Sequence, residues 1–416
     1  MTASHPTSAL RHRNFALLWS GQTISLAGNG VFTVALPLEV LRLTGSPLAL
    51  SLIVIARTIP AILLLLVGGS LVDRLPRRRV MLVCDLVSGI SVGIVAVLIA
   101  VGRPHLFDLA CLAVVFGTAN AFFKPASSAI TPDILPPSLY VSASSLSSLS
   151  QSLAQFLIGP LLGGFLVTVG GTAWAFGADA ASFVVSAACL AAMSRIERKP
   201  KSSRRIVEEI GEGLRYCRSR PWLWWSMIAV GISNFACFAP IVVLEPFLVK
   251  TVLHSGPLAL GVIFAANGVG GGAAALITGR RSEPKKIVKK IWIAWAAAGL
   301  CSVLLGLSTT VTLAAISAGA LWFFVTYGNI LWFPLMQREV PSDLLGRASS
   351  VDWMISIGLT PLGIVAGGAA ISLIGVRSTL IVGGLVAFAM GLVLFVPGVT
   401  EPDREKSGSS EISVAK

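Results

Sequence analysis

Glu39, Arg57, Asp179 and Glu245 are ionisable residues that lie within long apolar stretches of the sequence. A carboxylate in apolar surroundings can bind and release a proton, and a neighbouring arginine can form an ion pair that protonation or an anionic ligand breaks. These residue types suit a charge relay in which proton binding is coupled to a second event. A purely structural buried ion pair is the alternative interpretation for Arg57.

Arg57 lies about ten residues into an apolar stretch that begins at Pro47, which corresponds to about 15 Å along a helix. An unpaired charge at that depth is costly, so Arg57 is expected to face the protein interior and to have a partner. Glu39 is the first candidate, because its stretch and that of Arg57 should form a hairpin. Asp179 is the second candidate, and Asp108 is a third carboxylate at suitable depth.

The apolar stretches place the chain among polytopic helical membrane proteins. Of its 416 residues 55% are hydrophobic and 12% are charged, which is about half the charged fraction of soluble domains. About 20 apolar residues cross a bilayer as a helix, and the alternation expected of a transmembrane barrel is absent. The predicted spans are 15–41, 47–72, 80–101, 106–130, 139–169, 172–194, 222–249, 257–279, 287–308, 311–337, 350–374 and 378–398.

The distribution of basic residues predicts the orientation. An even number of spans puts both termini on one side, and that side carries 27 Lys and Arg residues against 4 on the other. The positive-inside rule therefore predicts cytoplasmic termini and a multi-pass protein of the cell membrane. The net charge of +13 is explained by this topology and does not require nucleic acid as a partner.

The sequence predicts two bundles of six helices each. The N-terminal bundle covers residues 1–194 and the C-terminal bundle residues 222–398, with a cytoplasmic linker at 195–221 and a disordered tail at 399–416. The linker is the longest polar stretch of the chain. Its part "EEIGEGLRYC" fits either a short amphipathic helix on the membrane face or a solvated connection.

The two halves repeat at a nearly constant offset. Glu39 matches Glu245 at an offset of 206, and "PLAL" at 47–50 returns at 257–260 at an offset of 210. Parallel six-helix repeats are typical of transporters in which two bundles rock around a site near the middle of the membrane. The repeat therefore predicts an all-α transporter with alternating access.

Glu245 is the first candidate for a proton-carrying group. The residue that corresponds to Arg57 in the second half is Asn267, so Glu245 has no cation at that position. A carboxylate with less compensating positive charge is protonated more readily. In the alternative interpretation Glu245 lies at the outer rim and stays ionised.

The segment "GGSLVDRLPRRRVML" at residues 68–82 resembles the signature that follows the second span in the major facilitator superfamily. That signature reads G-x-L-x-D-R-x-G-R-(R/K), and the residues that match it here are Gly69, Leu71, Asp73, Arg74, Arg77 and Arg78. Pro76 replaces the usual glycine. The resemblance covers almost all of the chain and implies the major facilitator fold of twelve transmembrane helices.

The charges of this segment suggest a gate at the cytoplasmic face. Asp73 is expected near the N-terminus of the span that begins at residue 350, because a helix N-terminus attracts an anion. Arg74 or Arg77 could reach Asp352 or Asp85. Such contacts would lock the cytoplasmic side and release on switching, whereas in the alternative interpretation the charges only set the topology.

The element "GPLLGG" resembles a motif of the drug-antiporter branches of the superfamily. Gly159, Gly163 and Gly164 lack side chains and allow helices to approach closely. Pro160 removes one backbone donor and bends the helix. Ordinary packing of small residues is the alternative explanation.

Longer phrases, such as "FFKPASSAITPDILP" at 122–136 and "QREVPSDLLGRASS" at 337–350, resemble the bacterial branch of the enterobactin exporter and macrolide-efflux-type proteins. The resemblance implies export of a siderophore or lipophilic drug, with proton entry as the driving force. Many proton-coupled antiporters of the superfamily carry an arginine inside span four. Span four of this chain has none before Lys124 at its cytoplasmic end.

In the major facilitator fold, spans one, four, seven and ten line the central cavity, and each of these spans carries an asparagine. Aromatic residues on spans seven and ten could stack on a planar ligand, although each of them also suits ordinary packing. The predicted cavity residues are Asn29, Asn120, Asn234, Phe235, Trp322, Tyr327 and Asn329.

Taken together, these features predict a secondary active transporter that exports a small molecule by proton antiport and acts as a monomer in the lipid bilayer. The alternatives are an importer or lipid flippase of the same fold, or a non-transporting membrane sensor. An enzyme is not expected, because the sequence lacks the H-E-x-x-H, G-x-S-x-G and Walker motifs. No cofactor is expected, and the scattered cysteines and histidines predict no metal site.

Overall fold

The computed structural model describes residues 8–72, 75–136, 139–194, 214–279, 287–341 and 344–391, which are helical apart from short turns. Most of the predicted linker and all of the predicted tail lie outside these residues. The elements of the first half are η1 (Ser8–Arg11), α1 (Arg13–Thr44), α2 (Pro47–Val72), α3 (Arg77–Ala100), α4 (Leu106–Ile134), α5 (Tyr140–Ser150), η3 (Gln151–Ile158) and α6 (Gly159–Ala192). Those of the second half are α8 (Pro221–Ser233), η4 (Asn234–Phe238), α9 (Ile241–Phe247), η5 (Leu248–Val252), α10 (Pro257–Gly279), α11 (Ile287–Leu307), α12 (Val311–Glu339), α13 (Leu345–Gly358) and α14 (Thr360–Gly391).

Within the described part of the chain, ten helical segments are long and apolar enough to cross a membrane. The longest runs from Ser142 to Ala192, and its 51 residues would extend about 77 Å as one helix, more than twice a hydrocarbon core of ~30 Å. It is broken by a kink at Gly171, where φ is 74°. The segment from Val351 to Gly391 has the same kind of kink at Gly375, where φ is 80°. Two crossings in each of these segments would give twelve spans, a number that stays a prediction.

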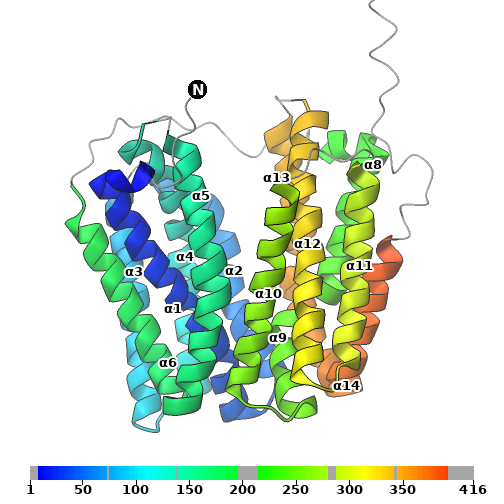
Figure 1. Ribbon diagram of the computed structural model, residues 1–416, viewed down its shortest axis with the longest axis horizontal. Coiled ribbons are helices and arrows are strands. Elements are labelled where there is room, and N and C mark those ends of the chain that lie inside the picture. The colour runs from blue at the N-terminus through cyan, green and yellow to red at the C-terminus, as the bar shows by residue number, and fades with distance from the viewer. Residues whose placement is uncertain are drawn as a thin grey trace, which may run out of the picture.

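The helices of the two halves stand side by side (Figure 1). Helices α1 to α6 lie on the left, α8 to α14 lie on the right, and the described N-terminal residues are at the upper edge, which we call the terminal face. The lower edge is the opposite face, where α1 ends at Thr44. Gly45 follows in a left-handed conformation, and its N–H donates to the carbonyl of Leu41. This is a common helix end, because glycine adopts positive φ without strain.

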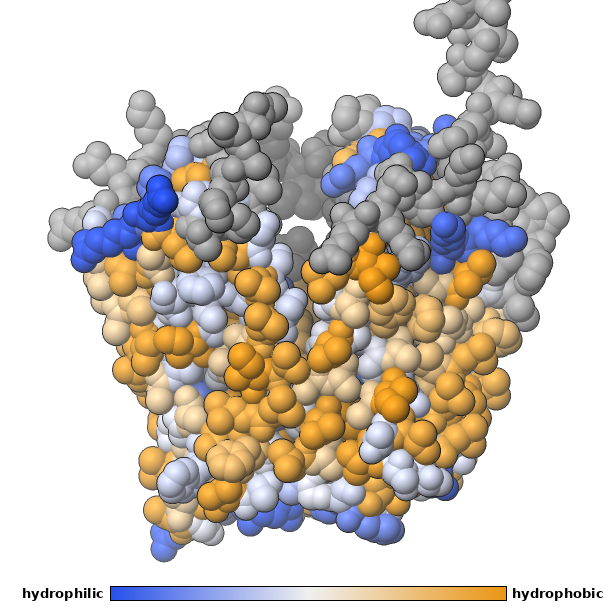
Figure 2. Space-filling model, viewed as in Figure 1, coloured by the Kyte–Doolittle hydropathy of each residue, from blue (hydrophilic) through white to orange (hydrophobic). Residues whose placement is uncertain are grey.

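The surface carries a broad apolar band between more polar edges (Figure 2). Large apolar side chains are exposed within the spans, among them Leu63 at 66%, Leu276 at 65% and Ile316 at 64%. In water such a band would be an aggregation hazard. It is the surface expected of helices that face lipid.

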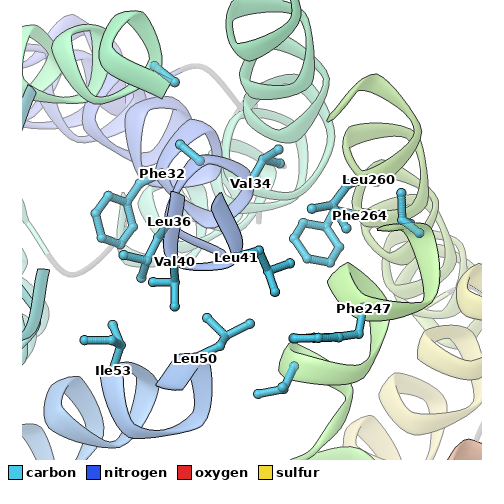
Figure 3. Packing of buried hydrophobic residues seen from close by; sticks show 14 of the residues in the cluster. Phe32, Val34, Leu36, Val40, Leu41, Leu50, Ile53, Phe247, Leu260 and Phe264 are labelled. Atoms are coloured by element: carbon cyan, nitrogen blue, oxygen red, sulfur yellow. The ribbon is translucent and has the colours of Figure 1, made fainter. Parts of the chain in front are cut away.

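An apolar cluster joins the two halves near the opposite face (Figure 3). Leu41 and Leu50 from the first half pack with Phe247, Leu260 and Phe264 from the second. All five side chains are less than 9% exposed.

Among the described residues, two hydrogen bonds also cross between the halves. Lys250 Nζ donates to the carbonyl of Leu41 at 3.0 Å, and Ser51 Oγ donates to the carbonyl of Ile364 at 3.0 Å. Since the Leu41 carbonyl belongs to the last turn of α1, Lys250 also stabilises the negative end of that helix. The opposite face is therefore held by apolar packing and by polar contacts.

In the described part of the chain, three short π-helical turns interrupt the spans: η3 before α6, and η4 and η5 around α9. In each, a backbone N–H bonds to the carbonyl five residues earlier, as Gly159 does to Ala154 and Ala239 does to Asn234. Pro160 and Pro240 follow the first two turns. Proline lacks a donor and its ring displaces the preceding turn, and a wider turn accommodates both effects.

Candidate transport pathway

A cavity of about 730 Å³ is lined by residues of the first half, a size typical of small-molecule sites. It extends from Phe15 and Tyr140, near the terminal face, to Arg57 and Phe116 at middle depth. Its polar lining includes Gln22, Asn29, Asn120, Lys124 and Gln155. The cavity thus leads from the terminal face into the middle of the bundle.

Two of the seven predicted cavity residues, Asn29 and Asn120, line this cavity. The other five belong to the second half and lie outside it. Asn234 donates to the carbonyl of Ser356 at 2.7 Å, because α8 packs against α13. Tyr327 stacks on Phe323 with ring centroids 6.3 Å apart, and Asn329 is exposed.

The remaining two predicted cavity residues are partly buried in the second half. Trp322 lies in α12 beside the small core of Leu321 and Val325, and Phe235 lies where α14 comes close. A Cβ at Gly363 would be 2.5 Å from the Phe235 carbonyl. The predicted ring of asparagines and aromatic residues is therefore represented in the cavity by its first-half members.

Arg57 lies against aromatic rings at the inner end of the cavity. Its guanidinium carbon is 4.6 Å from the ring centroid of Phe116 and 5.7 Å from that of Phe32. The two rings stack on each other with centroids 5.2 Å apart. A guanidinium over an aromatic face gains a cation–π attraction, which partly replaces the hydration that the side chain loses.

Asp179 is the carboxylate that acts on Arg57 electrostatically. It is fully buried, and its Oδ1 is 3.5 Å from Ser182 Oγ, while its Oδ2 has no hydrogen-bond partner among the described residues. Neither Asp179 nor any other described carboxylate lies within ion-pair distance of Arg57. The second predicted partner thus faces Arg57 without a direct bond.

The predicted pair of Glu39 with Arg57 is wrong. Glu39 is fully buried, binds Arg42 at 2.6 Å and 3.0 Å, and accepts a bond from Thr172 at 2.5 Å. Arg42 is three residues further along α1, a spacing that places two side chains on the same helix face. This spacing was visible in the sequence and would have identified the nearer cation.

Replacing Arg42 by glutamine is expected to lower the free energy of unfolding by about 1 kcal/mol, because Glu39 would lose a charged hydrogen-bond donor. Thermal unfolding in detergent measures the change. The double replacement with Glu39→Gln should recover part of the loss. Arg103→Gln, at an exposed turn of the same face, should leave stability unchanged, and an equal effect of both single replacements would contradict the assignment.

Glu245 is bound by a neutral partner from the adjacent span. It is 1% exposed, and Asn267 Nδ2 lies 3.2 Å from each of its carboxylate oxygens. Asn267 therefore contacts Glu245 from the position that corresponds to Arg57. Its own Oδ1 is buried without a hydrogen-bond partner among the described residues. A protonated Glu245 would carry one O–H donor, which an ionised carboxylate lacks.

The predicted gate is only partly within the described residues. Gly69 belongs to α2, whereas Asp73 and Arg74 lie outside the described part. Arg77 forms an ion pair with Asp133 at 2.8 Å. Arg78 donates to the carbonyls of residues 190 and 191, each at 2.6 Å, and so caps the end of α6.

The predicted contact of Arg77 with Asp352 or Asp85 is not formed in this conformation. Asp352 accepts from Trp332 Nε1 at 3.1 Å and from Ser356 Oγ at 3.2 Å, both within the second half. Asp85 is 2% exposed on the wall of the cavity. Asp133, at the end of the neighbouring helix α4, offers Arg77 a nearer carboxylate.

The predicted helix-packing residues lie where backbones approach closely. A Cβ at Gly159 would be 2.6 Å from the Ala27 carbonyl, and one at Gly163 would be 2.9 Å from Val31 Cα. Gly164 faces the second half, because its Cβ would be 2.9 Å from the Pro257 carbonyl. Helix α6 thus meets α1 through two of these glycines and α10 through the third.

Sequence reasoning missed the partner glycine on α10. A Cβ at Gly261 would be 2.5 Å from the Pro160 carbonyl and 3.3 Å from Gly164 Cα. A Cβ at Gly268, two turns further along, would be 2.3 Å from the Phe156 carbonyl. The seven-residue spacing of these two glycines on one helix face was the available signal.

Comparison with known proteins now identifies the family. The model of the transmembrane secretion effectors, a family of the major facilitator superfamily, matches residues 4–414. The chain belongs to this family. This chain is 27% identical over 409 residues to the multidrug efflux pump Tap of Mycolicibacterium fortuitum, with 94% of this chain and 96% of Tap covered.

Two further similarities agree with this assignment. The enterobactin exporter EntS of Citrobacter koseri is 23% identical over 340 residues, which cover 82% of this chain and 81% of EntS. The crystal structure of the nucleoside transporter NupG superimposes with a TM-score of 0.70 at 10% identity and covers 92% of this chain and 98% of that one. The protein is therefore a multi-pass membrane transporter of the major facilitator fold and not an enzyme.

Proposed function

We propose that this protein exports an organic small molecule across the cytoplasmic membrane, by alternating access and in exchange for protons. The terminal face is then the cytoplasmic face. The 27 basic residues predicted on that side against 4 on the other support this orientation. The residue ranges 1–194 and 222–398 are the two bundles that would rock against each other, in a protein that acts as a monomer.

The observation that carries the proposal is the cavity that reaches middle depth from the terminal face. At the opposite face the two halves are held together by the apolar cluster around Leu41 and Phe247 and by the bond from Lys250. A substrate can thus load from the cytoplasm while these contacts hold the two halves together at the outer side. The efflux activity in the names of Tap and EntS supports export as the direction.

The environment of Glu245 supports the proposal that protons are the coupling ion. It is buried and bonded to a neutral asparagine, so its protonation would not leave an unpaired cation behind. It also lies in the segment of span seven between the π-helical turns η4 and η5, and such turns are frequent at functional sites. Protonation in the outward-facing state and release in the inward-facing state would drive export.

Purified protein in liposomes with a pH-sensitive dye inside tests the proposal. With an acidic interior, addition of lipophilic cations, macrolides, catecholate siderophores or aromatic acids outside should make the interior more alkaline for at least one compound class, because antiport exchanges entering substrate for leaving protons. Empty liposomes are the control. Substrate uptake without a pH change would refute proton antiport, and no uptake of any compound would refute the exporter assignment.

A further inference from the structure

Positive charge dominates the ionisable groups that face the cavity. Arg57 is half-buried and Lys124 is exposed, and both belong to its lining. Of the carboxylates nearby, Asp85 also belongs to the lining but is only 2% exposed, and Asp179 is 0% exposed. The two cations also act on each other electrostatically, so an anion placed between them would relieve a repulsion.

The guanidinium of Arg57 has hydrogen-bonding capacity that the described residues do not use. An arginine carries five N–H donors in a planar fork. No hydrogen bond from this fork to a described residue is formed, and the contacts of its planar group are with the rings of Phe32 and Phe116. Polar groups at such depth are normally satisfied, and a carboxylate or similar oxyanion matches the fork in shape and charge.

The approach to Arg57 from the terminal face is lined by aromatic side chains. Phe15, Trp19, Phe123 and Tyr140 belong to the wall of the cavity, together with neutral amides such as Gln22. Aromatic rings offer a large apolar area that suits a planar ligand. The occupant thus needs an acidic group at its inner end and an aromatic body behind it.

We propose that the transported substrate is an aromatic organic acid whose anionic group binds to the guanidinium of Arg57. This proposal rests on the proposed export function and specifies the substrate class of the same cavity. Lys124 contributes positive potential closer to the terminal face, and Asp179 holds Arg57 in place from behind. A lipophilic cation would meet repulsion at the inner end of the cavity.

Carboxyfluorescein and rhodamine 123 provide a matched pair of probes, because they share a xanthene ring system and carry opposite charge. Binding to the purified full-length protein is measured by fluorescence anisotropy. The wild-type protein should bind carboxyfluorescein at least about tenfold more tightly than rhodamine 123, a difference of about 1.4 kcal/mol. Arg57→Gln should abolish this preference, Arg57→Lys should keep part of it, and Arg103→Gln at an exposed turn should keep all of it.

A double variant protects the test against misfolding. Arg57→Gln leaves Asp179 without its cation, so Arg57→Gln with Asp179→Asn restores neutrality and should also lose the anion preference. Three outcomes would overturn the proposal. The wild-type protein could prefer rhodamine 123, or it could bind neither dye. Carboxyfluorescein binding could also be unchanged both in Arg57→Gln and in Arg57→Gln with Asp179→Asn. Proton movement driven by a cationic compound in liposomes would support the export function and refute the anionic substrate. Binding of carboxyfluorescein that depends on Arg57, without any transport in liposomes, would support the anionic ligand and refute the export function.

Discussion

Glu245→Gln is expected to reduce substrate-driven proton movement to the level of empty liposomes while exchange of labelled substrate continues. Glutamine imitates the protonated carboxyl group in shape and charge but cannot release a proton. Asn267 can still bond to this glutamine, because Asn267 Nδ2 lies 3.2 Å from both oxygens of Glu245. Asn267 Oδ1 has no hydrogen-bond partner among the described residues and can accept a bond. The fold should therefore tolerate the change.

Glu39→Gln is the matched control, since Glu39 occupies the corresponding position of the first half. Glu39 binds Arg42 and Thr172, so its replacement should lower stability and leave proton movement intact. The pH-sensitive dye inside liposomes and radiolabelled substrate exchange give the two readouts. Proton movement that survives in Glu245→Gln would place the carrier elsewhere, and its loss in Glu39→Gln alone would assign the role to the first half.

Gly261→Val is expected to keep the outer side of the transporter from closing. The new Cβ would lie 2.5 Å from the Pro160 carbonyl and 3.3 Å from Gly164 Cα, and both neighbours are backbone atoms of the other half. Overpacking of this kind costs about 1–3 kcal/mol, which lowers the population of this conformation by about 5- to 150-fold. Transport should fall accordingly, because alternating access requires both states.

Cysteine accessibility measures this shift. Leu50 is 0% exposed in the apolar cluster between the halves, so Leu50→Cys should react slowly with an impermeant maleimide added from the outer side. The experiment uses a background without the six native cysteines. Gly261→Val should accelerate labelling, whereas Gly272→Val on the same helix, where a Cβ meets no atom within 4 Å, should not. Equal labelling rates of Leu50→Cys in the two variants would contradict the prediction that a side chain at position 261 separates the halves.

The fold class was predictable because hydropathy and span length are local properties of the sequence. The breaks predicted at 170–171 and 375–377 include Gly171 and Gly375, the residues at which the structure kinks. Glycine at both positions is the residue that accepts φ of 74° and 80° without strain. The close approach at Gly159 and Gly163 was likewise visible as a run of small residues.

The partners of the buried charges were less predictable, because they depend on how each helix is rotated about its axis. Depth along a span suggested Glu39 for Arg57, but rotation turns Glu39 toward Arg42 and Thr172 and leaves Arg57 among aromatic rings. The repeat also suggested equal contributions of both halves to the cavity. The cavity that leads from the terminal face is lined by the first half alone among the described residues, since similar sequences in the two halves do not have to expose the same faces at the same time.

The π-helical turns also determine which face of span seven carries Glu245. The turn η4 (Asn234–Phe238) lies between the start of this span and Glu245, and its backbone bond spans five residues where an α-helical bond spans four. One residue more or fewer in a regular α-helix rotates every later side chain by about 100°, which would turn Glu245 away from Asn267. The wide turn holds its additional residue locally. Glu245 therefore keeps the buried orientation that its first-half counterpart Glu39 also has.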